Sequence, residues 1–328
     1  MNNNNAKQVI RDTVRRFQHL PSKTIARILI SEYGELFDND LEKARKRVRN
    51  VRGQSGKHIR EVTADKSLYL DKTTALKMPE TWRKPIAHYK LPEGLWLVLS
   101  DIHVPFHEPL PIEAAFQSGH AEKVDGILLN GDAQDCASVS FWPTAKRQFN
   151  REVAAFIDFL DFMRQEFPTQ KVVYKPGNHE YRLPRHYVSK MPELAESPLS
   201  AMETVIGFEE RDIEFLDYHQ LVMAGELPII HGHEIRGTST AVNAARGLFL
   251  KTKSFSACSH WHSTSMHSAK NIHGEYLTTW SFGCLCQLNP EYSPFGNDWN
   301  WGFGLVNVEK NGDFELINRR VLPSGKVV

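Results

Sequence analysis

The chain has 328 residues with a formal net charge of +1, and 41% of its residues are hydrophobic and 24% are charged. This length exceeds one average domain, so we expect one large domain with a smaller appendage. No apolar run approaches the roughly 20 residues that span a membrane, and no basic and then apolar signal segment opens the chain, which together predict a cytoplasmic protein without a membrane partner.

Three helices are predicted in residues 1–66. The spacing of apolar residues and the stop signals place them at about residues 6–19, 22–33 and 41–52. Ser22 is expected to cap the second helix, and Asp38 or Asn39 is expected to cap the third. Two helices joined by a short turn that contains glycine, with a basic exposed surface, have the layout of a helix-turn-helix module that reads DNA.

Positive charge is concentrated in this N-terminal segment. Residues 1–66 hold 15 Lys and Arg against 8 Asp and Glu, whereas the rest of the chain holds 25 against 31. Such a split indicates a module that faces a polyanion, because this density of cations suits the neutralisation of several phosphates. A solvated helix face is the alternative interpretation. We predict binding to nucleic acid, DNA rather than RNA, through Lys43, Arg45, Lys46, Arg47, Arg49, Arg52, Lys57 and Arg60.

Residues 67–94 are polar, contain spaced prolines and are predicted to form a linker. Residues 95–328 are predicted to form an α/β domain, because strand-like apolar runs alternate with helical stretches at about 111–122 and 145–166. Further along, antiparallel strands of a second sheet are expected at about residues 276–282, 302–308 and 314–319.

Five apolar runs of the larger domain end in residue types that bind metal ions. The run at 126–130 is representative: a buried strand is followed by Gly131, which lets the backbone turn, and then by Asp132. In layered α/β folds the carboxyl ends of the strands form the rim where ligands bind, so we expect the five ends to converge. The other four runs end in Asp101 and His103, in Asn178 and His179, in His231, and in His260 with His262.

The chain has four cysteines. They lack the paired spacing of a zinc knuckle, so we interpret them as reduced, structural thiols. They are Cys136, Cys258, Cys284 and Cys286.

In this order, the Asp-x-His, Gly-Asp-x-x-Asp, Gly-Asn-His-Glu, His-Gly-His and His-x-His signatures resemble the calcineurin-like metallophosphoesterase family, which includes purple acid phosphatases and Mre11-type nucleases. The resemblance covers roughly residues 95–310 and implies two packed sheets with helices outside, an αββα sandwich. One departure is Ser259, which adds a side chain to a tight turn where the family usually has glycine. The N-terminal segment resembles helix-turn-helix modules found ahead of phosphoesterase domains in some phage-encoded proteins.

The resemblance also implies a set of metal ligands. Two divalent ions are expected as cofactors, and the mixture of oxygen and imidazole ligands favours Mn²⁺, with Fe, Zn or Ni as alternatives, over calcium. Asp132 is implied to bridge the two ions. The first ion is implied to be held by Asp101, His103 and His262, and the second by Asn178, His231 and His260.

By the same resemblance, the reaction is in-line hydrolysis of a phosphate ester by a metal-bridging hydroxide. His179 is implied to stabilise the transition state or to protonate the leaving oxygen. Asp135 and Glu180 are expected to orient ligating or catalytic histidines through hydrogen bonds, without binding the metal themselves.

Three functions are compatible with these features. The leading hypothesis is a phosphodiesterase or nuclease that hydrolyses nucleic acid and is directed by the basic N-terminal module. The second is a phosphomonoesterase or small-nucleotide hydrolase in which residues 1–66 serve oligomerisation or protein contact. The third is a non-enzymatic, DNA-binding scaffold, which is disfavoured because the ligand set is complete.

Overall fold

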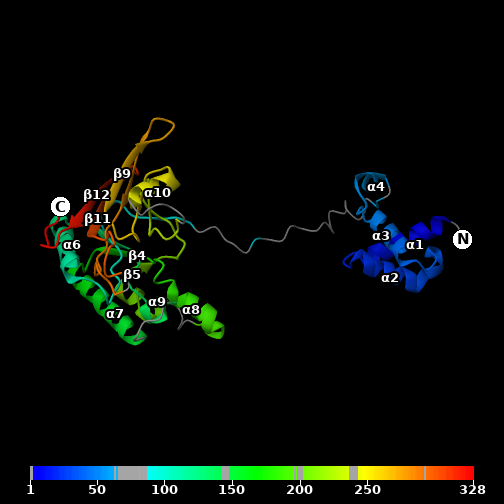
Figure 1. The fold of residues 1–328 in the computed structure, drawn as a ribbon, viewed down its shortest axis with the longest axis horizontal. Coiled ribbons are helices and arrows are strands. Elements are labelled where there is room, and N and C mark those ends of the chain that lie inside the picture. The colour runs from blue at the N-terminus through cyan, green and yellow to red at the C-terminus, as the bar shows by residue number, and fades with distance from the viewer. Residues whose placement is uncertain are drawn as a thin grey trace. The chain divides into compact units, whose positions relative to one another are not determined.

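The computed structural model describes most of the chain in two compact units, Met1–Lys84 and Pro85–Val328 (Figure 1). Most of the predicted linker lies outside the described residues. Within them, no helix is long and apolar enough to cross a membrane. The described residues are 3–62, 64–65, 81, 87–141, 148–195, 197, 202–235, 243–291 and 293–328.

The N-terminal unit is helical and has a small core of its own. Its elements are α1 (Asn3–Arg16), α2 (Ser22–Tyr33), the 3-10 turn η1 (Gly34–Phe37), α3 (Leu41–Val51) and α4 (Lys57–Val62). The helices pack because each has an apolar stripe at helical spacing. The stripes bury Ile10, Val14, Ile25, Ala26, Leu29, Phe37, Ala44 and Val48.

Both predicted caps of this unit differ in the structure. The α2 helix already includes Ser22, whose hydroxyl bonds to Gln54 and Arg52 and caps no amide. The cap of α3 is Asp40, whose side chain accepts from the amides of the second and third residues after it. Asp38 and Asn39 instead adopt positive φ values in the turn that leads to Asp40. The acidic run Asp-Asn-Asp offered several caps, and the turn geometry selects one of them.

The larger unit contains two mixed sheets of six strands. In the first sheet β2, β3, β4 and β5 are mutually parallel, and β11 joins β2 antiparallel. Its order is β12 (Phe314–Val321), β11 (Trp301–Val308), β2 (Gly94–Leu99), β3 (Gly126–Asn130), β4 (Lys171–Lys175) and β5 (Ile213–Phe215).

The second sheet is built around two parallel pairings, β7 with β8 and β8 with β10. Its first strand, Tyr89–Lys90, falls in the stretch that the sequence assigned to the linker, and it pairs with β6. The order is β1 (Tyr89–Lys90), β6 (Val222–Ala224), β7 (Leu227–Ile230), β8 (Ser256–Cys258), β10 (Tyr276–Ser281) and β9 (Ser265–Lys270).

Alternating side chains on the central strands divide the apolar interior into two layers. On β2, Leu97 and Leu99 join the core beneath the helices, whereas Trp96 and Val98 face the second sheet. On the outer faces lie α6 (Pro109–Glu122) and α7 (Phe149–Glu166) against the first sheet and α10 (Ala244–Thr252) against the second (Figure 1). This is the expected αββα sandwich. The remaining helical segments are η2 (Ala137–Val139), α8 (Arg182–Lys190), η3 (Pro192–Leu194), α9 (Met202–Ile206) and η5 (Glu209–Arg211).

The partition of strands between the sheets differs from expectation. The predicted strands at 302–308 and 314–319 are not part of the second sheet, because β11 and β12 extend the first one beside β2. The five strands that carry the metal-binding signatures belong to both sheets, three to the first and two to the second. Periodicity marks a strand but does not choose its neighbour.

The two cores predict separate unfolding of the two units. Phe37 is fully buried, so Phe37→Ala should remove about 3–5 kcal/mol from the N-terminal unit and leave the larger unit unchanged. Calorimetry and circular dichroism would follow the two transitions, with the half-exposed Tyr33→Ala as the control. A shift of one common transition would contradict this expectation.

Candidate metal centre

The predicted ligands sit on tight turns at the strand ends. Five of the seven have a left-handed backbone, with φ between 52° and 69°. Residues other than glycine adopt this region at a cost, and such strained positions cluster at functional sites. The turns bring side chains together at the ends of strands from both sheets. The five are Asp101, His103, Asp132, His260 and His262.

Two glycines allow the loops to approach one another. A Cβ on Gly131 would lie 2.4 Å from Nδ1 of His231, and a Cβ on Gly177 would lie 2.3 Å from Oδ1 of Asp132. Either added carbon would displace a ligand. The glycines of the signatures are therefore required by close packing as well as by the turn itself.

Oδ2 of Asp132 is the common neighbour of imidazoles from several loops. It lies 3.1 Å from Nε2 of His231, 3.8 Å from Nε2 of His179 and 4.0 Å from Nε2 of His103. His260 belongs to the same group as Asp132 and His231, with ligand atoms within 4.8 Å of one another. This is the placement that a bridging carboxylate requires.

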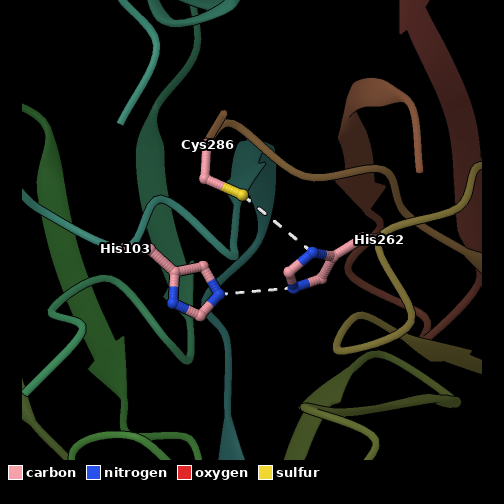
Figure 2. A group of neighbouring side chains, drawn as sticks. All are labelled: His103, His262 and Cys286. Carbon is pink, nitrogen blue, oxygen red and sulfur yellow. Dashed lines mark hydrogen bonds between the residues drawn. The ribbon is translucent and has the colours of Figure 1, made fainter. Parts of the chain in front are cut away.

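The other group forms around His262. Its Nε2 lies 3.2 Å from Oδ1 of Asp101 and 3.3 Å from Nε2 of His103. In Figure 2, dashed lines join the ring of His262 to His103 and to Cys286. Its Nδ1 lies 3.9 Å from the Cys286 sulfur. The structure thus brings all three predicted ligands of the first ion together.

The donor atoms themselves indicate that the pocket fits divalent ions. Buried polar atoms are normally hydrogen-bonded, yet Oδ1 of Asp101, Oδ1 of Asn178 and Nε2 of His231 have no hydrogen-bond partner within the described part of the chain. All three are oxygen or imidazole donors of the kind that Mn²⁺, Fe, Zn and Ni accept. The residues present therefore fit two divalent ions, and this donor set does not choose among those four metals.

Electrostatics keep the carboxylates of the centre ionised. Burial would raise the pKa of Asp132, but His179 and His231 hold it well below its usual value. Burial likewise opposes the charge of Asp101, whose pKa falls to about 2 beside His262. The same pairing raises the pKa of His262 to about 10 against the effect of burial. Protons and metal ions therefore compete for this imidazole.

Asp135 lies behind two of the histidines. Its Oδ1 accepts hydrogen bonds from Nδ1 of His103 at 2.8 Å and from Nδ1 of His179 at 3.0 Å. Both rings then present Nε2 to the pocket, since a donated Nδ1 proton fixes the tautomer. The position is the one that the sequence predicted for an orienting carboxylate.

Glu180 has a different role from the one expected. Among the described residues its carboxylate contacts no histidine; it accepts from the amides of Asp132, Gln134 and Gly177 and from the hydroxyl of Tyr174. It is fully buried. Glu180 therefore joins two signature loops through their backbones and does not orient an imidazole.

Two further contacts fix the loops of the second sheet. Lys175 is 1% exposed, and its Nζ lies 2.8 Å from Oε1 of Glu234, a carboxylate that also accepts from the amide of Gly232. Ser259, the departure from the family pattern, is buried, and its hydroxyl accepts from Nδ2 of Asn130 at 2.8 Å. The added side chain thus links the turn to the end of β3.

The sequence missed two neighbours of the centre. Cys286, interpreted as structural, faces His262, and Arg182 donates to His179. The ring centroid of Trp299 also lies 4.1 Å from that of His262. No local signal marks Cys286, because the chain returns to the centre only after β10. Arg182 follows the Gly-Asn-His-Glu signature by two residues, and a cation so close to the signature could have been predicted to lie beside the centre.

The calcineurin-like phosphoesterase family profile matches residues 96–271, so the chain belongs to that family. It is therefore a metal-dependent phosphoric ester hydrolase, in a family that normally binds two divalent ions.

Solved structures that the chain matches include Vacuolar Protein Sorting 29 from Cryptosporidium parvum, with 13% identity over 72% of this chain and 96% of that one and a TM-score of 0.37. The phosphoesterase Yfce from E. coli has 12% identity over 68% of this chain and 98% of its own, with a TM-score of 0.32. A dimetal phosphatase from Danio rerio has 11% identity over 70% of this chain and 96% of its own, with a TM-score of 0.36. No curated protein matches the sequence.

Removal of the Asp135 carboxylate should weaken metal binding. Asp135→Asn leaves His103 and His179 without their shared anionic acceptor, so Mn²⁺ affinity is expected to fall by about 10- to 100-fold. Titration of metal-free protein with Mn²⁺, followed by electron paramagnetic resonance of the free ion, measures the change. Asp161→Asn, at a surface pair with Arg211, is the control. Unchanged affinity in Asp135→Asn would contradict the assigned position.

The pair of Glu234 and Lys175 predicts a pH-dependent stability. Burial would raise the pKa of Glu234, but Lys175 lowers it from 4.5 to about 2. The pair therefore stabilises the fold above about pH 4.5, and this contribution is lost as pH falls toward about 2.

Glu234→Gln should consequently lower the free energy of unfolding by roughly 3 kcal/mol at pH 7, because it leaves a buried ammonium unpaired. The difference from wild type should shrink below about pH 4.5. Urea unfolding in EDTA across this pH range tests it, with the exposed Glu291→Gln as the control. A constant difference at all pH values is the contrary result.

Proposed function

We propose that this chain is a phosphodiesterase or nuclease that hydrolyses nucleic acid, and that residues 1–66 bind the polymer. The observation that carries the proposal is a basic groove on the N-terminal unit. It runs along one face of α3 and the turn before α4 and encloses about 660 Å³. Its lining residues are Glu42, Arg45, Lys46, Arg49, Gln54, Ser55 and Gly56.

The groove suits a phosphate backbone for two reasons. Arg45, Lys46 and Arg49 lie at helical spacing on one face of α3, so their charges add along the groove. Gly56, which has a φ of 101° and open space around it, lets a polymer approach the backbone closely. Glu42 is the one acidic lining residue, and it pairs with Arg45 at 3.2 Å.

The predicted cations are not equivalent. Arg52 donates to the carbonyls of Leu20 and Gln18 and to the hydroxyl of Ser22, which commits it to holding the α1–α2 turn. Lys43 pairs with Asp38. Arg47 lies over the ring of Phe37, and Arg49 donates to the carbonyl of Gln54. Lys46 and Lys57 are exposed. Arg60 lies on α4. Lys46 and Arg49 are the cations we expect to contribute most to binding.

At the metal centre, we assign Asp101, His103 and His262 to one ion and Asn178, His231 and His260 to the other, with Asp132 between them. Bound ions at such a site act as Lewis acids that activate water and neutralise charge on the phosphoryl oxygens. Asp135 holds the rings of His103 and His179 in place, and Glu180 holds the loops that carry Asp132 and Gly177. His179 borders the pocket where the leaving group would lie.

Charge reversal in the groove should separate polymer binding from ester hydrolysis. Lys46→Glu with Arg49→Glu is expected to weaken nucleic-acid binding roughly 100-fold at low salt. The slope of the logarithm of the binding constant against the logarithm of the salt concentration should become shallower by about 2, because two phosphate contacts are lost. The rate on a small diester should not change. Fluorescence anisotropy with labelled DNA and RNA, and Mn²⁺-dependent cleavage assays, provide the measurements.

The matched control is Lys7→Glu with Arg11→Glu, which makes the same charge change on exposed positions of α1. If both double variants lose affinity equally, the groove has no special part in binding. If the wild type cleaves no polymer but hydrolyses small monoesters, the phosphomonoesterase alternative replaces this proposal.

A further inference from the structure

Arg182 places a guanidinium group against the metal centre. It is the first residue of α8, two positions after the Gly-Asn-His-Glu signature. Its Nη2 lies 2.8 Å from Nε2 of His179, and its Nη1 donates to the backbone carbonyl of Asp135 at 2.9 Å. The side chain keeps 25% of its surface exposed, so the charge is held in position and still reaches solvent.

This contact defines which group offers a positive charge at the pocket. A guanidinium stays charged and only donates hydrogen bonds. Nη1 of Arg182 also lies 3.7 Å from Oδ2 of Asp135, so an ion pair as well as the two hydrogen bonds holds this cation beside His179.

The free donors of Arg182 suit a tetrahedral oxyanion. A guanidinium has five N–H groups in a planar fork that matches phosphate oxygens. Within the described residues, the contacts to His179 and Asp135 use two of them. Nε2 of His179 also lies 3.8 Å from Oδ2 of Asp132. Only the side chain of His179 therefore separates Arg182 from the carboxylate that joins the two ligand groups.

We propose that Arg182 binds the non-bridging oxygens of the substrate phosphoryl group and positions the phosphorus beside His179 and the metal ligands. The inference rests on phosphate ester hydrolysis at this centre and does not require a nucleic-acid substrate. It assigns to Arg182 a binding role that the signature residues do not fill. The side chain recognises the phosphoryl group that every ester of the class shares.

The test compares Arg182→Gln and Arg182→Lys with Arg185→Gln, an exposed arginine of the same helix. Inorganic phosphate binding to the Mn²⁺-loaded protein is measured by calorimetry, and kcat and KM are measured with a small phosphate diester. Manganese content and circular dichroism are recorded for each variant. Arg182→Gln should weaken phosphate binding and raise KM by about 10- to 100-fold, as expected for loss of a charged hydrogen-bond donor, with kcat and metal content within about threefold of wild type.

Arg182→Lys keeps the charge without the fork, so its phosphate affinity should lie between those of wild type and Arg182→Gln. Phosphate affinity within twofold of wild type in Arg182→Gln overturns the proposal. So does loss of manganese from that variant, which would show that Arg182 only supports His179 and Asp135. If Arg182→Gln does not fold, unchanged phosphate affinity in Arg182→Lys has the same meaning. A failure of the nucleic-acid proposal is distinct, because it leaves phosphate binding intact and polymer uncleaved.

Discussion

The contact between the buried carboxylate of Asp132 and the imidazole of His231 is the interaction on which the metal centre of the larger unit depends. Asp132 follows β3 in the first sheet, and its Oδ2 lies 3.1 Å from the imidazole of His231, which follows β7 in the second sheet. A buried carboxylate is costly unless charges and hydrogen bonds compensate it. Here His179 and His231 lower its pKa, and the amide of His179 donates to Oδ1. The contact joins the end of a strand in each sheet, and Asp132 belongs to two of the groups of candidate ligands.

The centre is assembled from groups that are unfavourable one at a time. Several ligands have left-handed backbones, and three donor atoms are buried without a hydrogen-bond partner in the described part of the chain. Such a site persists because the surrounding structure holds it. Glu180 joins two loops through their amides, Glu234 pairs with buried Lys175, and Asn130 links β3 to Ser259. These contacts hold the loops that carry the donor atoms.

The N-terminal unit shows why charge composition alone is an incomplete guide. The sequence identifies a basic surface, but it cannot separate a cation that faces solvent from one that holds the fold. Arg52 is spent on backbone carbonyls of the α1–α2 turn, whereas Lys46 is exposed on the groove face. The difference arises from position, because Arg52 follows the last residue of α3 and reaches the α1–α2 turn, whereas Lys46 lies on the exposed face of that amphipathic helix.

Local features of the sequence were sufficient for the strands that carry the signatures, for most helices and for the residues at each strand end. They did not predict the short strands β1, β5 and β6 or the edge strand β9. Apolar periodicity and a glycine before a polar side chain act over a few residues, so Asp132 and His231 could be recognised as candidate ligands without a fold. Only the tertiary structure decided that β11 and β12 extend the first sheet, that Glu180 contacts amides, and that Arg182 and Cys286 border the histidines. These outcomes depend on which strands pair and how loops pack, and both are set by contacts between residues far apart in the chain, which local pattern does not encode.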